Sequence, residues 1–270
     1  MWRPMALPQC PRCVITGAGG GFGRALALAL AARGAHLILS DVEAAGAEET
    51  ARLATDAGAK SVRASRCDVT KLEEVRAVAA SCPGPLDLVV NNAGVSSAGR
   101  VGDLSIEDWR WTLEVDLFGV IHRCHVFVPL LRSQGHGHVL NVASAAGLFS
   151  APLMGAYNVA KAGVIALSET LNAELVGSGI GVTVLCPTFF KTNIANSGRF
   201  TDEKTRDMAR RFVDKGRTAE EVARAALASV DRGHLYAVPM ADARWLWRLK
   251  RAAPSTFSSL AGRVGRRAVR

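Results

Sequence analysis

The sequence predicts an α/β fold: a single doubly wound domain with a mostly parallel, seven-stranded sheet flanked by helices, followed by a basic helical extension. Two observations predict it. Short apolar runs alternate with longer amphipathic segments along residues 1–240, which is typical of parallel strands covered by helices on both faces. Hydrophobic residues form 49% of the 270-residue chain, enough to bury a substantial core, which excludes global disorder.

The predicted strands and helices follow one another in chain order. The apolar runs predicted to be strands are Cys13–Thr16, His36–Ser40, Ser61–Cys67, Leu86–Val90, His138–Val142, Gly181–Leu185 and Leu235–Val238. The amphipathic segments predicted to be helices are Phe22–Arg33, Val42–Ala57, Lys71–Ala80, Ile106–Arg132, Ala156–Val176 and Thr218–Arg232. One remaining segment, Thr188–Gly216, is polar and weakly periodic, and we expect it to form a mobile flap over the site.

The positive charge of the chain is concentrated at its C-terminal end. The whole sequence carries a net charge of +9, yet residues 241–270 hold eight basic residues and one acid. Residues 1–240 are therefore nearly neutral, which divides the chain into a globular domain over 1–240 and an extension over 241–270. A nucleic-acid partner is not expected, because such binding requires phosphate-neutralising charge across a face of the folded body.

No segment predicts a membrane-spanning helix or a secretory signal. The longest Ala/Leu run, Ala25–Ala32, is far shorter than the roughly 20 residues needed to cross a bilayer, and the N-terminal residues lack a continuous apolar stretch. We therefore expect a cytoplasmic protein whose six cysteines are reduced thiols. Neither Cys10 and Cys13 nor His122 and His125 is completed by further ligands at metal-binding spacing, so no metal site is predicted.

A glycine-rich turn directly follows the first predicted strand. Residues 16–23 read TGAGGGFG and lead into an Ala/Leu-rich helix. Glycines in this position let the backbone turn tightly and approach a pyrophosphate, which then contacts exposed amides at the helix N-terminus. The turn predicts a dinucleotide site of the Rossmann type, with the cofactor-contacting residues Gly17, Gly19, Gly21, Phe22 and Gly23.

An acid at the end of the second predicted strand indicates which dinucleotide is bound. Asp41 lies 18 residues beyond Gly23, where a carboxylate can accept hydrogen bonds from the adenosine ribose hydroxyls. The same charge would repel a 2′-phosphate at close range. Arg24 and Arg63 are the nearest residues that could compensate a 2′-phosphate, and neither has an obvious placement. The sequence therefore favours NAD over NADP.

Three further stretches complete an ordered set. Residues 91–94 read NNAG after the fourth strand, Ser144 follows the fifth, and Tyr157 and Lys161 share one face of the next helix through their i, i+4 spacing. Ser144 precedes Tyr157 by 13 residues. Together with the glycine-rich turn, this set resembles the short-chain dehydrogenase/reductase (SDR) family in its Tyr-x-x-x-Lys form, and the resemblance covers residues 12–240.

The resemblance implies a role for each of these residues, and elementary chemistry supports it. Tyr157 would exchange a proton with the substrate oxygen during hydride transfer, and a neighbouring cation, Lys161, would favour its phenolate form. Ser144 would hydrogen-bond the substrate oxygen. Lys161 would also bind the nicotinamide ribose, and Asn91 would stabilise the central sheet. Further cofactor contacts that the family pattern implies are Asp68, Val69, Asn92, Ala93, Gly94, Pro187 and Thr192.

One position departs from the family pattern within the fourth predicted helix. Where the family usually has Val-Asn-Leu-x-Gly, residues 115–119 read VDLFG, so Asp116 replaces an asparagine that serves a water-mediated proton relay towards the lysine. An ionised carboxylate can accept a hydrogen bond but cannot donate one. Asp116 either takes part in catalysis by strengthening the charge on Lys161, or it caps a helix kink while backbone carbonyls carry the relay.

These features together predict an enzyme, an oxidoreductase that transfers a hydride between NAD(H) and a secondary alcohol or ketone. Phe149 and Phe189 are candidate substrate contacts in an apolar pocket, with Ser144 and Tyr157 at the reacting oxygen, which favours a lipophilic substrate. Two alternatives stay open: an NADPH-dependent 3-oxoacyl or polyketide-type reductase, and a catalytically degenerate nucleotide-binding protein at membranes. Asp41 disfavours the first alternative, and the intact Ser-Tyr-Lys set disfavours the second.

The basic extension has an amphipathic pattern of its own. Trp245, Leu249 and Ala252 recur at helical spacing opposite arginines, and a similar pattern follows Pro254. A basic helix that contains tryptophan can lie on an anionic membrane as a peripheral contact. The other interpretation packs this apolar face against the body or a neighbouring subunit, since the resemblance implies a homodimer or homotetramer. The remaining residues of the two patterns are Arg244, Arg248, Arg251, Phe257, Leu260, Ala261, Arg263, Val264, Arg266 and Arg267.

Overall fold

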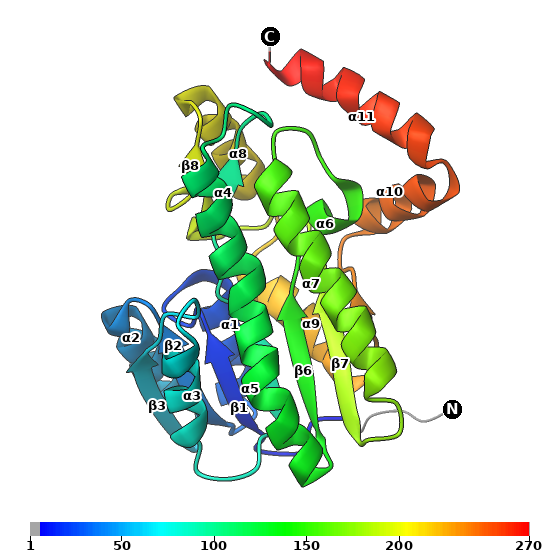
Figure 1. The fold of residues 1–270 in the computed structure, drawn as a ribbon. Coiled ribbons are helices and arrows are strands. Elements are labelled where there is room, and N and C mark those ends of the chain that lie inside the picture. Colours follow the sequence, from blue (N-terminus) through cyan, green and yellow to red (C-terminus); the bar gives the residue numbers. More distant parts are fainter. Residues whose placement is uncertain (1–5, 270) are drawn as a thin grey trace.

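A seven-stranded parallel sheet forms the centre of the molecule (Figure 1). The structure, a computed structural model, describes residues 6–269, with side chains described as far as residue 263. Within that part of the chain the strand order is β3-β2-β1-β4-β6-β7-β9, which confirms the predicted doubly wound α/β fold. The strands are β1 (Arg12–Thr16), β2 (His36–Asp41), β3 (Ser61–Arg66), β4 (Leu88–Asn91), β6 (Gly137–Val142), β7 (Ile180–Leu185) and β9 (Tyr236–Ala237).

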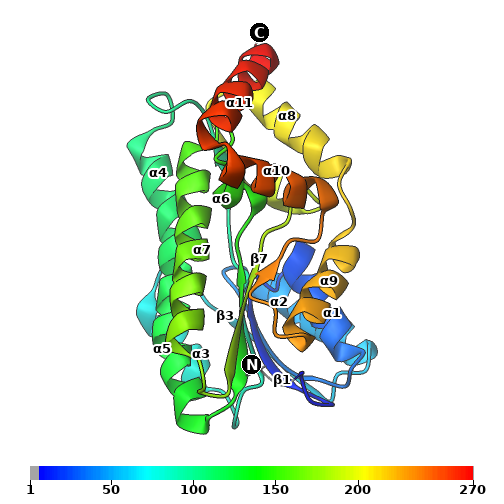
Figure 2. The same cartoon turned by 90° about the vertical axis from the view of Figure 1, so that its right-hand side faces the viewer.

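Helices cover both faces of this sheet, as Figure 2 shows. One layer holds α1 (Gly21–Ala31), α2 (Ala44–Asp56) and α9 (Ala219–Asp231), and the other holds α3 (Leu72–Ala80), α5 (Gly119–Gln134) and α7 (Gly155–Glu174). Strands β4 and β7 are buried at every residue between the two layers. Burial on both faces explains why these strands read as unbroken apolar runs rather than as alternating patterns.

The strand order places a switch point between β1 and β4. The chain passes from β1 outward to β2 and β3, and then returns to β4 on the other side of β1. In such sheets the loops at the carboxyl ends of the two diverging strands leave a crevice in which ligands bind. The glycine-rich turn follows β1 and residues 92–94 follow β4, so both predicted cofactor segments border this crevice.

The helix predicted over Ile106–Arg132 is present without a break, but it contains a π-helical turn. Helix α4 (Ile106–Leu113) is followed by a π-helical turn over Glu114–Phe118, and only then by α5. A π turn accommodates one extra residue in the helical repeat, so it changes the direction of one side chain without removing the amphipathic pattern. The side chain concerned is Asp116, which is fully buried.

The segment Thr188–Gly216 is more ordered than the predicted flap. It contains a short 3₁₀ helix (Asn193–Ala195), a strand β8 (Arg199–Phe200) that pairs with β5 (Ser97–Ala98), and a helix α8 (Glu203–Asp214). The Asp202 side chain caps α8 by accepting the Thr205 backbone N–H at 2.8 Å. The segment is polar because α8 is highly charged, with Arg206 paired to Glu203 at 2.9 Å, rather than because it lacks structure.

The C-terminal extension forms two helices, α10 (Ala241–Ala252) and α11 (Pro254–Val269). Helix α10 contacts the body through the fully buried Ala243 and through Trp247, whose ring centroid lies 4.7 Å from that of Tyr236. The predicted apolar stripe faces away from these contacts, since Trp245 is 71% and Leu249 is 49% exposed. The stripe therefore does not pack on the body. The side chains of Val264, Arg266 and Arg267, and all of Arg270, lie outside the described residues.

Two predictions about the whole chain concern its cysteines and its membrane topology. All six cysteines are free thiols, and Cys13, Cys67, Cys124 and Cys186 are buried. Over the described residues, none of the helices combines the length and hydropathy that a membrane span requires.

Candidate active site

The glycine-rich turn and the loop after β4 are held against each other. The Asn92 amide donates to the carbonyls of Thr16 at 2.8 Å and Gly17 at 3.0 Å. Gly17 has a φ of +62°, and a Cβ on Gly23 would lie 2.1 Å from the Gly17 carbonyl oxygen. Only glycine allows this close approach, which leaves a narrow cradle lined by backbone at the start of α1.

Asp41 is already engaged with the glycine-rich turn. Its Oδ2 accepts the Gly19 backbone N–H at 2.7 Å, and its Oδ1 accepts the Glu43 N–H at 3.0 Å. These bonds hold the carboxylate at the carboxyl end of β2, beside the cradle. An acid in this place fits a ribose diol, which donates hydrogen bonds, and opposes a phosphate.

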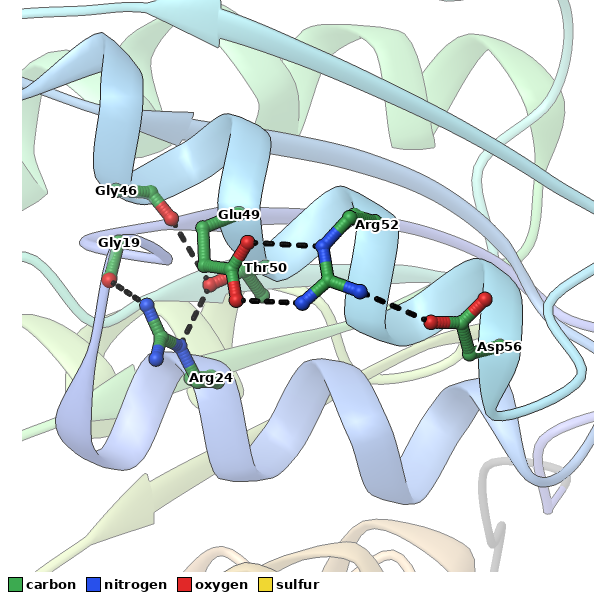
Figure 3. A network of polar contacts seen from close by, with 7 residues as sticks. All are labelled: Gly19, Arg24, Gly46, Glu49, Thr50, Arg52 and Asp56. Atoms are coloured by element: carbon green, nitrogen blue, oxygen red, sulfur yellow. Dashed lines mark hydrogen bonds and ion pairs between the residues drawn. The ribbon is translucent and has the colours of Figure 1, made fainter.

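The two arginines that could compensate a 2′-phosphate have other partners, and Figure 3 shows those of Arg24. Arg24 donates from Nη2 to the Gly19 carbonyl at 2.6 Å and from Nε to the Thr50 hydroxyl at 2.9 Å. Arg63 donates to the Ser81 carbonyl at 3.1 Å, at the end of α3. Arg24 thus ties the glycine-rich turn to α2.

The residues of the predicted Ser-Tyr-Lys set meet at the carboxyl end of β6. Ser144 is close enough to Tyr157 to lower the pKa of the phenol through hydrogen bonding. Ser144 Oγ accepts the Ala146 N–H at 3.1 Å as the cap of helix α6 (Ala145–Phe149). Lys161 Nζ lies 5.5 Å from the centre of the Tyr157 ring. It also donates to the Val142 carbonyl at 3.3 Å.

Asp116 forms an ion pair inside this site. Its Oδ2 lies 3.1 Å from Lys161 Nζ, and both side chains are almost completely buried. Its Oδ1 accepts the Val95 backbone N–H at 2.7 Å. Gly94 makes room for the pair, because a Cβ there would lie 3.2 Å from Asp116 Oδ1 and 3.3 Å from Lys161 Nζ. Asp116 thus contacts Lys161 directly. The first of the two interpretations left open by the sequence, in which Asp116 strengthens the charge on Lys161, requires this contact.

Burial and mutual charge shift the pKa values of all three groups. Burial raises the pKa of Tyr157, Lys161 opposes this rise, and Asp116 adds to it. Burial disfavours the charge on Lys161, yet its pKa is raised because Asp116 and Tyr157 stabilise the ammonium. Burial also raises the pKa of Asp116 against the influence of Lys161 and the Val95 N–H. The cation that would activate Tyr157 is thus partly neutralised by Asp116.

The other predicted cofactor residues surround the cradle. Thr192 lies above Gly21, whose Cβ would come within 3.7 Å of it. The Pro187 carbonyl accepts the Ala145 N–H at 2.8 Å, which fixes the segment after β7 beside Ser144. Asp68 caps its own loop by accepting the Thr70 hydroxyl at 2.7 Å.

Two predicted cofactor residues have buried side chains. Phe22 packs edge-on against Phe190 at 5.5 Å between ring centroids, so its amide rather than its ring is available at the turn. Val69 is buried against α5, where a Cβ on Gly119 would meet it.

The two candidate substrate residues belong to different aromatic pairs. The Phe149 ring lies 6.3 Å from that of Phe257 in α11, and the Phe189 ring stacks 5.1 Å from that of Phe212 in α8. Phe189 is 42% exposed. Phe149 therefore links the region after Ser144 to α11, and Phe189 links the region after Pro187 to α8. The two candidate substrate residues make no ring contact with each other.

Sequence reasoning did not identify several groups that hold the site. Backbone groups such as the Val95 N–H and the Val142 carbonyl leave no signal in side-chain patterns. His122, which the sequence showed only as part of an incomplete metal-ligand pair, bonds the Val69 carbonyl at 3.0 Å. The Asn91 amide bonds Asn141 at 2.7 Å beneath the site, and its oxygen accepts Arg123 Nε at 3.2 Å. The position of Arg123 within an apolar stretch of α5 is a sequence signal that predicts a buried polar contact of this kind.

Comparison with known proteins agrees with this geometry. Residues 12–203 match the model of the short chain dehydrogenase family. The chain is 34% identical over 255 residues to the putative oxidoreductase SadH of Mycobacterium tuberculosis, with 92% of each chain covered. It is 34% identical over 216 residues to a D-beta-hydroxybutyrate dehydrogenase of Rhizobium meliloti, covering 77% of this chain and 79% of the other.

Solved structures show the same fold with either dinucleotide. A short-chain dehydrogenase/reductase from Burkholderia phymatum in complex with NAD superposes with a TM-score of 0.86 at 32% identity, covering 95% and 96% of the two chains. A short-chain dehydrogenase from Sphingobium yanoikuyae in complex with NADPH gives 0.77 at 27% identity, covering 92% and 95%. The chain belongs to the short-chain dehydrogenase/reductase family. It is an NAD(P)-binding oxidoreductase that acts on alcohol groups.

Proposed function

We propose that the protein transfers a hydride between NAD(H) and a lipophilic secondary alcohol or ketone at its Ser144–Tyr157–Lys161 site. The observation that carries this proposal is the proximity of these three side chains at the carboxyl end of β6, where Lys161 borders Gly94 in the loop after β4. The bound nicotinamide ring would supply or accept the hydride. The residues of the chain would supply the rest of the chemistry, which consists of proton transfer and hydrogen bonding.

Tyr157 and Ser144 handle the substrate oxygen in this mechanism. In ketone reduction, Tyr157 Oη donates a proton to the oxygen as the hydride arrives, and in alcohol oxidation it accepts that proton. Ser144 Oγ donates a hydrogen bond to the same oxygen and stabilises its developing charge. Lys161, held by the Val142 carbonyl and Asp116, orients the ribose hydroxyls and stabilises the Tyr157 phenolate.

Asp116 adjusts this site towards reduction. Its carboxylate is 3.1 Å from the Lys161 ammonium and offsets the positive charge that would otherwise lower the pKa of Tyr157. Tyr157 then stays protonated over the neutral pH range, as a proton donor must. Alcohol oxidation, which requires the phenolate, would need a more alkaline pH.

NAD is the proposed cofactor rather than NADP. Asp41 fits the ribose diol at the end of β2, while Arg24 is bound to Gly19 and Thr50 and Arg63 is bound to Ser81. Arg66, which pairs with Asp41 in the β2–β3 register, is bound to Glu74 at 2.8 Å. Backbone and side-chain contacts to the cofactor would come from Gly17, Gly19, Gly21, Phe22, Gly23, Asp68, Val69, Asn92, Ala93, Gly94, Pro187 and Thr192.

The rest of the proposed function concerns substrate, assembly and location. Phe149 and Phe189 provide apolar surface beside the segments that carry Ser144 and Pro187, which supports a lipophilic substrate. Phe118 and Val159, 44% and 50% exposed, support homo-oligomer formation through the layer of α5 and α7. We place the catalytic domain at residues 1–240, and assign to residues 241–270 a peripheral contact between a cytoplasmic protein and an anionic membrane.

Replacing the phenol tests the proposal. Tyr157→Phe should lower turnover by at least about a thousandfold, because the proton donor is lost, while NADH affinity changes little. The measurement is steady-state turnover on a panel of secondary alcohols and ketones, with NADH and NADPH titrated separately by fluorescence. Thr112→Val, which removes a buried hydroxyl that bonds Ser97 and is not part of the Ser144–Tyr157–Lys161 set, serves as the control. Turnover that survives in Tyr157→Phe would show that another group moves the proton.

A further inference from the structure

A second cavity lies outside the catalytic centre, between α9, β9 and α10. Its volume is about 350 Å³. Three of its lining residues are arginines: Arg232 directly after α9, and Arg244 and Arg248 in α10. The neighbouring rings of Tyr236 and Trp247, tilted by 43° to each other, form part of its wall, and the lining includes no acid. The cavity is therefore positively charged and has an aromatic side.

The charge of this cavity has no counterion within the described chain. None of the three arginines forms an ion pair with a described carboxylate: Asp231 is paired with Arg33 at 3.0 Å, and Asp242 accepts the Ala243 N–H at 2.8 Å. Glu169, outside the lining, accepts the Tyr236 hydroxyl. Arg244 is held in place by the carbonyls of Val238 at 2.8 Å and Pro239 at 3.2 Å, which leaves part of its guanidinium free to bind. Clustered guanidinium groups without a carboxylate favour an anionic ligand.

The outer face of α10 adds apolar surface next to this charge. Trp245 and Leu249 are 71% and 49% exposed, on the side of the helix away from the buried Ala243, and Leu246 beside them is 40% exposed. The Arg248 guanidinium lies 5.8 Å from the centre of the Trp245 ring, so it borders both the cavity and the apolar face. Positively charged surface and apolar surface thus meet along α10.

We propose that this cavity binds the phosphate of an anionic phospholipid headgroup, with the outer face of α10 lying in the bilayer interface. The planar fork of arginine matches phosphate oxygens in pairs, and tryptophan is favoured at the boundary between headgroups and acyl chains. The proposal specifies the membrane contact assigned to residues 241–270 and does not depend on the hydride-transfer chemistry.

The position of α10 gives this contact a consequence for the enzyme. Lys250 of α10 donates to the Leu148 carbonyl at 2.7 Å and to Ser150 Oγ at 3.2 Å, at the end of α6. Figures 1 and 2 place α10 and α11 at the same end of the molecule as α6, which begins beside Ser144. A bilayer bound by α10 would lie at the end of the protein where an apolar substrate enters.

The test is sedimentation of the full-length protein with lipid vesicles. It should bind phosphatidylcholine vesicles that contain phosphatidylglycerol and not vesicles of phosphatidylcholine alone. Arg232→Gln should weaken this binding about fivefold, and Arg232→Gln combined with Arg248→Gln about 25-fold, by the usual contribution of one basic residue near an anionic surface. Arg224→Gln, an exposed arginine of α9 outside the cavity, should leave binding unchanged.

Several outcomes would overturn the proposal. One is an equal loss of vesicle binding in Arg224→Gln and Arg232→Gln, which would show that binding depends on the overall positive charge and not on the cavity. Another is arginine-dependent binding of inorganic phosphate, measured by calorimetry, without vesicle binding, which would assign the cavity to a free phosphate. A third is self-association that the cavity variants abolish without any vesicle binding, which would make this face an interface between copies. Turnover in solution should stay normal in Arg232→Gln. A failure of the lipid-binding proposal can therefore be distinguished from a failure of the dehydrogenase assignment.

Discussion

Two buried cations on neighbouring helices are treated very differently by this protein. Lys161 of α7 and Arg123 of α5 are both nearly inaccessible to solvent. Lys161 has a carboxylate partner, Asp116, at 3.1 Å. Arg123 donates from Nε to Asn91 and lies 4.3 Å from the centre of the Phe127 ring, but its two terminal nitrogens have no hydrogen-bond partner among the described residues.

The difference between these two side chains shows how a carboxylate partner changes the effect of burial on a cation. Burial lowers the pKa of Arg123 to about 10, the direction expected when no carboxylate compensates desolvation. The pKa of Lys161 is raised in spite of equal burial, because Asp116 and Tyr157 stabilise its charge. The ammonium of Lys161 is thus stabilised as a cation, whereas the guanidinium of Arg123 holds Asn91 at a desolvation cost that no carboxylate offsets.

The largest expected effect comes from removing the partner of Lys161. Asp116→Leu should lower the free energy of unfolding by about 3–5 kcal/mol, because it leaves a buried ammonium without a counterion. It also leaves the Val95 N–H without an acceptor. Chemical denaturation measures the loss. Asp108→Asn, which breaks the partly exposed pair with Arg199, is the control and should cost no more than about 1 kcal/mol.

The isosteric change separates the electrostatic role of Asp116 from its structural one. Asp116→Asn keeps an acceptor for Val95 but removes the negative charge, so the pKa of Tyr157 should fall. The pH dependence of alcohol oxidation should then move towards acid. Superimposable pH–rate profiles for the two proteins would reduce Asp116 to a structural residue of the π turn.

A third buried titratable group, His138, extends the comparison to a side chain that avoids charge altogether. Burial lowers its pKa to about 3, and its Nε2 bonds the Thr183 hydroxyl at 2.8 Å. The unfolded chain binds a proton near pH 6.5, so stability is full above that pH and falls as the pH drops towards 3. In His138→Leu the loss of stability between neutral pH and roughly pH 5 should shrink by about 2 kcal/mol. Unchanged acid sensitivity in urea titrations would show that His138 charges in the fold.

The smallest effect is expected at the cation without a partner. Arg123→Met removes the uncompensated charge and keeps a flexible side chain against Phe127, while one hydrogen bond to Asn91 is lost. The free energy of unfolding should rise by about 1 kcal/mol, because the desolvation cost of the charge exceeds that bond. Thermal unfolding provides the measurement. A drop comparable to that of Asp116→Leu would mean that Arg123 is compensated in solution.

The sequence predicted most of the fold because the relevant signals are local. Apolar runs and glycines mark β1, the glycine-rich turn and α1 directly, and residues 91–94, 144, 157 and 161 carry their roles in their spacing. The π turn at Glu114–Phe118 escaped prediction because one extra residue hardly alters amphipathicity. Helix α8 escaped it because its stability comes from the Asp202 cap and charge pairs rather than from an apolar stripe.

Local sequence alone determined the class of this protein: a parallel α/β sheet, a dinucleotide cradle and a Ser-Tyr-Lys set. The tertiary structure decided what pairs with what. It brought Asp116 to Lys161 across two helices, left Arg123 without a partner, and turned the apolar face of α10 away from the body. The physical reason is range: backbone preference and hydrophobic periodicity act within a few residues, whereas ion pairing and burial depend on distances that only the assembled fold sets.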